Sequence, residues 1–133
     1  MSDFRRVTDS FSVSPQIGVQ DVAKAKAEGF TRIINNRPDG EAPDQPSAAE
    51  IEAEARAHGL DYHHIPVVGR PTQAQIDAVH QAAGEGRTLA YCRSGTRSII
   101  AWAQAELAKG AKTRAQILAA AEAAGYELSA LLP

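Results

Sequence analysis

The sequence predicts an α/β protein in three layers, with a central, mostly parallel sheet flanked by helices. Three observations support this. Short runs of β-type residues alternate with alanine-rich segments of helical periodicity. Strands that alternate with longer helices are typical of parallel sheets, because each parallel connection needs a crossover. The chain has 133 residues, of which 44% are hydrophobic, and shows no internal repeat, so one domain spanning residues 1–133 is expected.

The expected strands are five short runs rich in β-branched and aromatic residues. They alternate with the helical segments in the order strand, strand, helix, strand, helix, strand, helix, strand, helix, helix. In sequence order, the strands cover residues 4–7, 11–13, 31–35, 62–67 and 88–91.

The helices are delimited by capping signals. Three of them open with a capping box, in which a hydroxyl caps one amide and a residue three places on reaches back. These boxes are Ser47 with Glu50, Thr72 with Gln75, and Thr113 with Gln116. Glycines follow four helical runs, as is common at helix ends. They are Gly29, Gly59, Gly110 and Gly125.

Two segments are less regular. Residues 36–46 are rich in Pro, Asp and Gly and form the one long expected connection, and long ordered loops in small domains are often functional. The alanine-rich tail at 113–133 fits either an extra helix against the sheet or a contact with another subunit.

Composition argues against several function classes. The formal net charge is −2, from 14 basic and 16 acidic residues without a basic run, so nucleic acid is not an expected partner. No apolar stretch is long enough to cross a bilayer and no secretion segment follows the first residues, so a cytoplasmic protein without membrane contact is expected. His63 and His64 would face opposite sides of a strand, and a single cysteine cannot form a zinc site of paired thiols. We expect no metal and no cofactor.

The chemical centre predicted by the sequence is Cys92. It follows the strand at 88–91 directly, and a helix is expected to open at Ser98. A loop that curls into a helix N-terminus directs several backbone amides inward and forms an anion site. These amides and Arg97 should stabilise a cysteine thiolate, and Gly95 would supply a conformation that other residues resist. The alternative is a buried structural cysteine before an ordinary helix cap.

Neighbouring residues are candidates for contacts with an anionic substrate. Arg37 could offer a second guanidinium to an anion, or could pair with Asp39 or Glu41 at the surface. Arg93 could contact the substrate or be solvated. The candidate substrate-binding residues are Arg93, Ser94, Gly95, Thr96, Arg37 and Asn36.

Two motifs resemble a known bacterial family. Cys92-x-x-Gly95-x-Arg97-Ser98 is similar to the active-site loop of the cysteine-dependent phosphatases. The segment at 33–41, Ile-Ile-Asn-Asn-Arg-Pro-Asp-Gly-Glu, resembles a second signature of one branch, the beta-lactamase hydrolase-like protein, phosphatase-like domain. The resemblance extends from residue 4 to about 108. It implies a protein tyrosine phosphatase-like fold, with Cys92 as nucleophile, Arg97 as oxyanion clamp and Ser98 as a hydrogen-bond donor to the cysteine sulfur.

Three features depart from the phosphatase pattern. Only four residues separate Cys92 from Arg97, where phosphatases have five, and this shorter loop is more like that of the rhodaneses, which carry sulfur as a cysteine persulfide. Tyr91 stands where tyrosine phosphatases usually have His. The segment at 65–72, where their general acid would lie, contains no carboxylate.

A substitute proton donor could come from the long connection at 36–46. Asp39 or Glu41 could reach the mouth of the site, because the loops after parallel strands gather at one edge of the sheet. The alternative for Asp39 is a turn residue within Pro-Asp-Gly.

Three functions follow from these observations. The favoured one is sulfur-group transfer through a covalent persulfide on Cys92, with a small anionic or sulfane-sulfur substrate. The second is hydrolysis of a phosphate ester through a cysteinyl-phosphate, with Arg97 as clamp and Asp39 or Glu41 as acid. The third is a non-catalytic anion-binding module. The family name also suggests a metallohydrolase-like partner.

Overall fold

The computed structural model describes residues 3–133 and contains one five-stranded sheet. The strands lie in the order β1-β2-β5-β3-β4, and only β1 runs antiparallel to its neighbour. The mostly parallel sheet is therefore confirmed. The strand bounds are β1 Arg5–Arg6, β2 Phe11–Ser14, β3 Arg32–Asn35, β4 Asp61–His64 and β5 Thr88–Tyr91.

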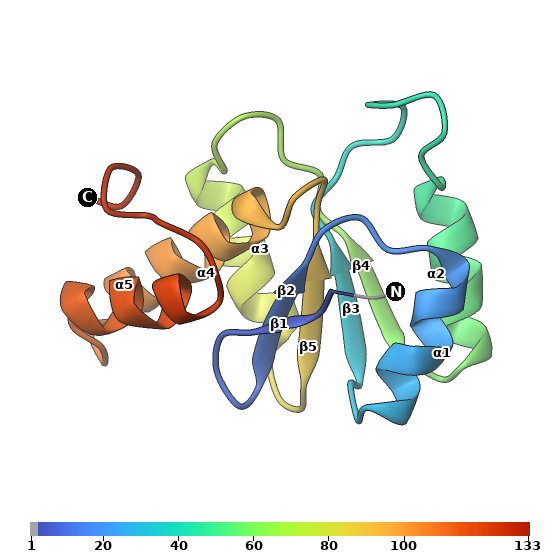
Figure 1. Cartoon of the computed structure of the whole chain (residues 1–133), viewed down its shortest axis with the longest axis horizontal. Helices are drawn as coiled ribbons and strands as arrows, with labels where there is room; N and C mark the ends of the chain where they lie inside the picture. Colours follow the sequence, from blue (N-terminus) through green and yellow to red (C-terminus); the bar gives the residue numbers. More distant parts are fainter. Residues whose placement is uncertain (1–2) are drawn as a thin grey trace.

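Helices cover both faces of the sheet (Figure 1). The first two helices lie on one face, the next two on the other, and the last lies outside the fourth. Their bounds are α1 Val19–Ala27, α2 Ala48–Ala57, α3 Gln73–Ala83, α4 Thr96–Lys109 and α5 Arg114–Ala123. The three expected capping boxes are present at the starts of α2, α3 and α5. Local hydrogen bonding specifies these starts, which explains why the sequence locates them well.

The sheet separates two sets of core side chains. Ile33 and Tyr91 pack with α1 and α2, whereas Ile34 and Ala90 pack with the helices on the other face. Successive strand residues face opposite sides, so this division follows from the period of two in a strand. Cys92 follows Tyr91 directly, at the carboxyl end of β5.

Two strands differ from their expected bounds at both ends, whereas β2 and β3 differ by one residue at one end. The first is only Arg5–Arg6, because the Val7 and Thr8 amides both turn back to the Phe11 carbonyl. The run expected at 62–67 is assigned as β4 Asp61–His64. Beyond it the chain continues beside β3, with the Ile65 and Val67 amides donating to the carbonyls of residues 35 and 36.

The tail forms a helix that belongs to the core. Ile117 and Ala121 of α5 are fully buried and pack in one cluster with α4. Leu128 and Leu132 extend that cluster after the helix ends. The tail therefore forms the expected extra helix, but α5 packs on α4, outside the layer of helices that covers the sheet, and not against the sheet itself (Figure 1).

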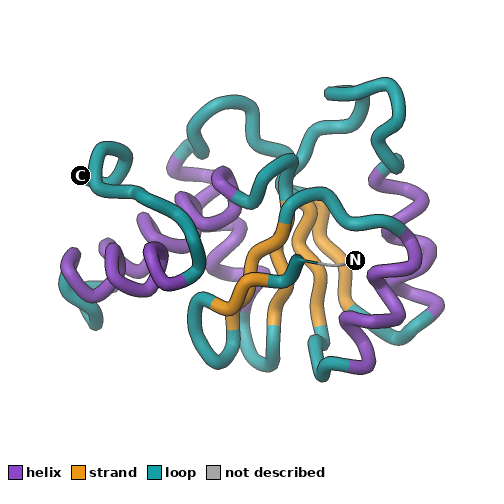
Figure 2. Tube along the Cα trace, in the orientation of Figure 1, coloured by secondary structure: helices purple, strands orange, loops and turns teal. Residues whose placement is uncertain are grey.

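The loops that follow the parallel strands gather at one edge of the sheet (Figure 2). Parallel strands end at the same edge, where ligands of open α/β sheets commonly bind. This edge brings together the Cys92 loop, the connection at 36–47 and the segment at 65–72.

Candidate active site

Cys92 lies at the start of a tight loop and is fully buried. The Gly95 amide donates a hydrogen bond to its Sγ at 3.1 Å. Gly95 has φ +94°, in the left-handed region, and a Cβ there would collide with the Tyr126 hydroxyl. Glycine is therefore required both by the backbone and by the close approach of Tyr126. Gly95 is the N-cap of α4, which begins at Thr96, so the positive end of the helix dipole lies next to the amide that contacts the sulfur.

Arg97 is fixed by acceptors at the far end of its guanidinium. Nη1 donates to Glu41 Oε2 at 2.8 Å and to the Val67 carbonyl at 2.7 Å. Nη2 donates to Glu41 Oε1 at 2.8 Å. The hydrogen bond to Glu41 is the main cause that raises the pKa of Arg97, and Cys92 adds to this. Nε and the second hydrogen of Nη2 are the donors left over for an anion beside the sulfur.

Glu41 joins two arginines. Its Oε1 also accepts from Arg37 Nε at 3.0 Å, and Arg37 Nη1 donates to Gln16 Oε1 at 3.0 Å. The hydrogen bond from Arg97 is the main cause that lowers the pKa of Glu41 to about 2. Burial opposes it, and the hydrogen bond from Arg37 lowers the pKa further. Glu41 is therefore a carboxylate at neutral pH. Arg37 makes the pairing with Glu41 that the sequence offered as one of two interpretations, but its side chain is only 5% exposed and therefore buried, not at the surface as expected.

Asn36 and Ser98 hold the Cys92 loop in place through hydrogen bonds. The backbone N–H of Asn36 donates to the Tyr91 carbonyl at 2.7 Å, and the side-chain Nδ2 donates to the Ile65 carbonyl at 2.9 Å. Ser98 Oγ donates to Asn36 Oδ1 at 2.8 Å. A hydroxyl carries one proton, so in this arrangement Ser98 gives it to Asn36 and not to the sulfur. Both residues are fully buried, and their hydrogen bonds connect the ends of β3 and β5 to α4.

Asp39 lies at the start of α2. Its Oδ1 accepts the Ala48 amide at 2.7 Å, so it caps that helix N-terminus as an acceptor. The sequence offered Asp39 as a turn residue or a proton donor; it lies in a turn, and its contact with the Ala48 amide is a structural role that the sequence did not indicate.

The other loop residues lie nearer the surface. Arg93 and Ser94 are exposed, and Thr96 is partly buried. Ser94 Oγ and Thr96 Oγ1 are hydrogen-bonded at 3.0 Å. The Arg93 carbonyl accepts the Gln16 amide at 3.2 Å, which ties the loop to the segment after β2.

Tyr91 faces away from these groups. Its side chain is fully buried in the cluster with Tyr62 under α1 and α2, and its hydroxyl has no hydrogen-bond partner within residues 3–133. Burial is the main cause that raises its pKa. Tyr91 is therefore a neutral core residue.

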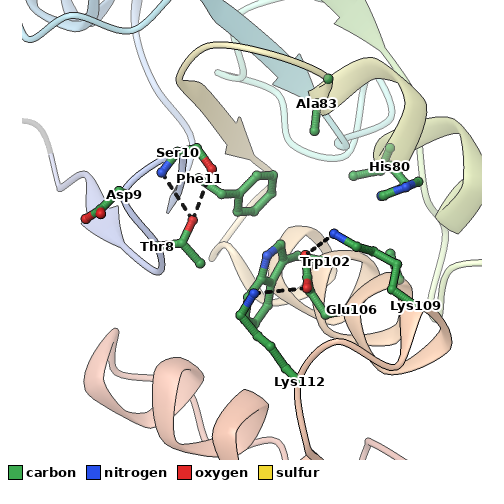
Figure 3. A pocket seen from close by; sticks show the side chains of 13 residues that line it. Thr8, Asp9, Ser10, Phe11, His80, Ala83, Trp102, Glu106, Lys109 and Lys112 are labelled. Carbon is green, nitrogen blue, oxygen red and sulfur yellow. Dashed lines mark hydrogen bonds and ion pairs between the residues drawn. The ribbon is translucent and has the colours of Figure 1, made fainter.

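A cavity of about 460 Å³ lies at the opposite edge of the sheet (Figure 3). Phe11 and Trp102 form an aromatic wall, with ring centroids 6.3 Å apart. Glu106 pairs there with Lys109 and Lys112. Phe11 begins β2, so this cavity is at the amino edge of the strands and shares no lining residue with the Cys92 loop.

Neither a metal site nor a membrane span is found in the described part of the chain. Within residues 3–133, no group of three or more His, Cys, Asp or Glu side chains could hold a metal ion. No helix in the same range is long and apolar enough to cross a membrane.

Residues 3–109 match the family model described as beta-lactamase hydrolase-like protein, phosphatase-like domain. The chain belongs to this family. Proteins named beta-lactamase hydrolase-like protein are 35% identical over 125 residues in Xylella fastidiosa and 36% identical over 128 residues in Agrobacterium fabrum. These alignments cover 92% and 94% of this chain but only 29% and 30% of the relatives. The chain thus spans less than a third of their length.

Solved structures confirm the protein tyrosine phosphatase-like fold. A crystal structure described as that of a candidate phosphatase from Neisseria meningitidis is 32% identical, with a TM-score of 0.82. The alignment covers 95% of this chain and 91% of that one. Kinase associated phosphatase is 15% identical, with a TM-score of 0.69 and coverage of 90% and 80%, and shows the shared fold alone. The protein is a member of the phosphatase-like superfamily.

Proposed function

We propose that the protein transfers sulfane sulfur through a persulfide on Cys92. The observation that carries this proposal is the state of the nearby acids. Glu41, which reaches Arg97, has a pKa of about 2 and holds no proton at neutral pH. Asp39 accepts the amide of Ala48 at the start of α2. Sulfur transfer needs no acid, whereas a phosphatase that cannot protonate its leaving alkoxide loses roughly 10²–10⁴-fold in rate.

The transfer consists of two displacements at sulfur. The Cys92 thiolate attacks the outer sulfur of a donor such as thiosulfate, a new S–S bond forms, and the donor S–S bond breaks to release sulfite with its electron pair. An acceptor thiolate then attacks the outer sulfur of the Cys92 persulfide and regenerates the Cys92 thiolate. Neither leaving group requires a proton. In this proposal the Gly95 amide, which donates to Cys92 Sγ, and the guanidinium of Arg97 stabilise the anions in both steps.

Loop length and burial also favour this chemistry. Four residues between Cys92 and Arg97 leave one amide fewer than the phosphatase loop, so the anion cradle is narrower. Cys92 is fully buried, which favours a small donor with a terminal sulfur over a bulky ester.

Hydrolysis of a phosphate ester is the second candidate. It is favoured by the likeness to the Neisseria meningitidis structure, whose described role is that of a candidate phosphatase. In this mechanism Cys92 would form a cysteinyl-phosphate and Arg97 would bind its equatorial oxygens. The proton donor would have to be Asp39 or Glu41, and the contacts of both oppose that role.

Intact-mass spectrometry distinguishes these functions. The protein is treated with thiosulfate, and separately with an aryl phosphate, and Cys92→Ser is the control. Sulfur transfer predicts the gain of one sulfur atom, which thiol or cyanide removes and which Cys92→Ser does not acquire. Phosphate release that requires Cys92, without a persulfide, would overturn the proposal in favour of the phosphatase. An anion that binds Cys92→Ser as tightly as the wild type, with no turnover of either substrate, would identify a binding module.

We further propose that the protein acts in the cytoplasm beside a metallohydrolase-like partner. The free thiol of Cys92 suits a reducing compartment such as the cytoplasm. The partner is inferred from the curated relatives, which carry the name beta-lactamase hydrolase-like protein and are more than three times as long as the part matched here. Co-purification with a metallohydrolase from the native host tests the pairing. Recovery of the protein in a periplasmic fraction would contradict the location.

A further inference from the structure

One peptide unit of the loop is held from both sides. The Gly95 amide donates to Cys92 Sγ at 3.1 Å, and the Ser94 carbonyl accepts from the Tyr126 hydroxyl at 2.7 Å. These two groups belong to the same planar peptide bond, and in a trans peptide they point in opposite directions. The contact at the carbonyl therefore fixes the direction in which the amide points.

Tyr126 comes from outside the family match at 3–109. It follows α5, and its own amide donates to the Ala121 carbonyl at 2.9 Å. The Arg5 guanidinium lies 5.2 Å from the centre of its ring. Arg114 donates to the Ser129 carbonyl at 2.9 Å and holds the segment after Tyr126 against α5. The ring is therefore anchored independently of the loop that it contacts.

The Tyr126 hydroxyl is suited to this role. Burial raises its pKa, against an opposing effect of Arg5, so the hydroxyl keeps its proton for the Ser94 carbonyl. The missing side chain of Gly95 provides the space in which the hydroxyl lies. The Tyr126 hydroxyl can therefore occupy this position only if residue 95 has no side chain.

We propose that Tyr126 is a positioning residue that sets the reactivity of Cys92 through the Ser94–Gly95 peptide. This rests on the proposed role of Cys92 as nucleophile. An amide directed at the sulfur favours the thiolate, because a hydrogen bond to a charged acceptor is stronger than one to a neutral acceptor. Without the hydroxyl, the peptide can rotate and the amide loses its alignment.

The test is Tyr126→Phe, which keeps the ring and removes only the hydroxyl. The charged side chains around the loop and Tyr126 stay unchanged; they are Asp3, Arg5, Arg37, Glu41, Arg93 and Arg97. Tyr62→Phe is the matched control, because its hydroxyl accepts from Asn35 at 3.1 Å among the residues packed under α1 and α2. It tests the loss of a buried hydroxyl without touching the loop.

The measurement is the ultraviolet absorbance of the thiolate as a function of pH. Cys92→Ser, made in the same background as each protein, is subtracted to remove the tyrosine signal. The chain has one cysteine, so the remaining signal belongs to Cys92. We expect the midpoint to rise by about one pH unit in Tyr126→Phe, equivalent to a roughly tenfold smaller acid dissociation constant, and to stay constant in Tyr62→Phe. A wild-type midpoint in Tyr126→Phe would overturn the proposal.

A second measurement needs only the wild-type protein. The NMR signal of the Gly95 amide should shift as Cys92 ionises, and a signal that does not respond would also overturn the proposal. Neither experiment requires a sulfur donor. A protein that fails to form a persulfide but shows the predicted midpoints would refute the proposed function and leave the role of Tyr126 intact.

Discussion

Glu41→Gln is predicted to destabilise the protein in a pH-dependent manner. The substitution keeps the size of the side chain and removes the charge that Arg37 and Arg97 share. The carboxyl pKa falls from 4.5 to about 2 in the folded protein. At ~1.4 kcal/mol per unit this is worth about 3 kcal/mol. The side chain of Glu41 is 28% exposed, so solvent screening reduces the expected loss of unfolding free energy to about 1–2 kcal/mol at neutral pH.

The sign of the pH dependence follows from the direction of this shift. A carboxyl whose pKa is lowered by folding stabilises the protein fully above its unfolded-state pKa, here 4.5. That stabilisation disappears as the pH falls towards about 2. The difference in unfolding free energy between wild type and Glu41→Gln should therefore shrink by roughly half by pH ~3 and continue to close below it.

Urea unfolding at neutral pH and at pH ~3 measures both quantities. Glu52→Gln is a suitable control, because Glu52 forms an exposed pair with Arg56 at 3.0 Å that should contribute only about 0.5 kcal/mol. Equal stability of wild type and Glu41→Gln at neutral pH would refute the reasoning. So would a difference that stays constant down to pH ~3.

Three further substitutions test the geometry of the site. Gly110→Ala, with open space around it, should cost about 1 kcal/mol of unfolding free energy for its left-handed backbone alone. Gly95→Ala should cost about 2–3 kcal/mol, because the new Cβ also meets Tyr126; equal losses in thermal denaturation would contradict the steric argument. Asp39→Asn should lower stability by about 0.5 kcal/mol and leave any release of phosphate from an aryl phosphate within about twofold of wild type; a roughly 100-fold slower release would identify Asp39 as a proton donor. Ser98→Ala leaves the buried Asn36 Oδ1 without its donor and should cost about 1–3 kcal/mol in urea unfolding; an unchanged midpoint would show that this hydrogen bond is unimportant.

The sequence predicted those parts of the fold that local physics determines. The capping boxes at Ser47, Thr72 and Thr113 need only residues three places apart, and all three form as expected. The alternation of strands and helices likewise predicted a mostly parallel sheet. The end of β1 was less predictable, because the turn of Val7 back to Phe11 competes with strand pairing.

The arrangement of the site was harder to predict, because its contacts join distant segments. Glu41 and Arg97 are 56 positions apart, and the sequence offered Glu41 only as a partner of Arg37 or as an acid. The Ser98 proton was expected at the sulfur but goes to Asn36, 62 positions away. Tyr126 gave no signal, because its contact with Ser94 depends on how the tail folds back over the loop.

The central claim is that Cys92 carries sulfur rather than phosphate. The most direct test compares two turnover rates for one preparation: thiocyanate formed from thiosulfate and cyanide, and phosphate released from an aryl phosphate. Sulfur transfer predicts the higher kcat/KM for thiosulfate, with loss of that activity in Cys92→Ser. A higher kcat/KM for the phosphate ester, also lost in Cys92→Ser, would contradict this account and identify the protein as a phosphatase.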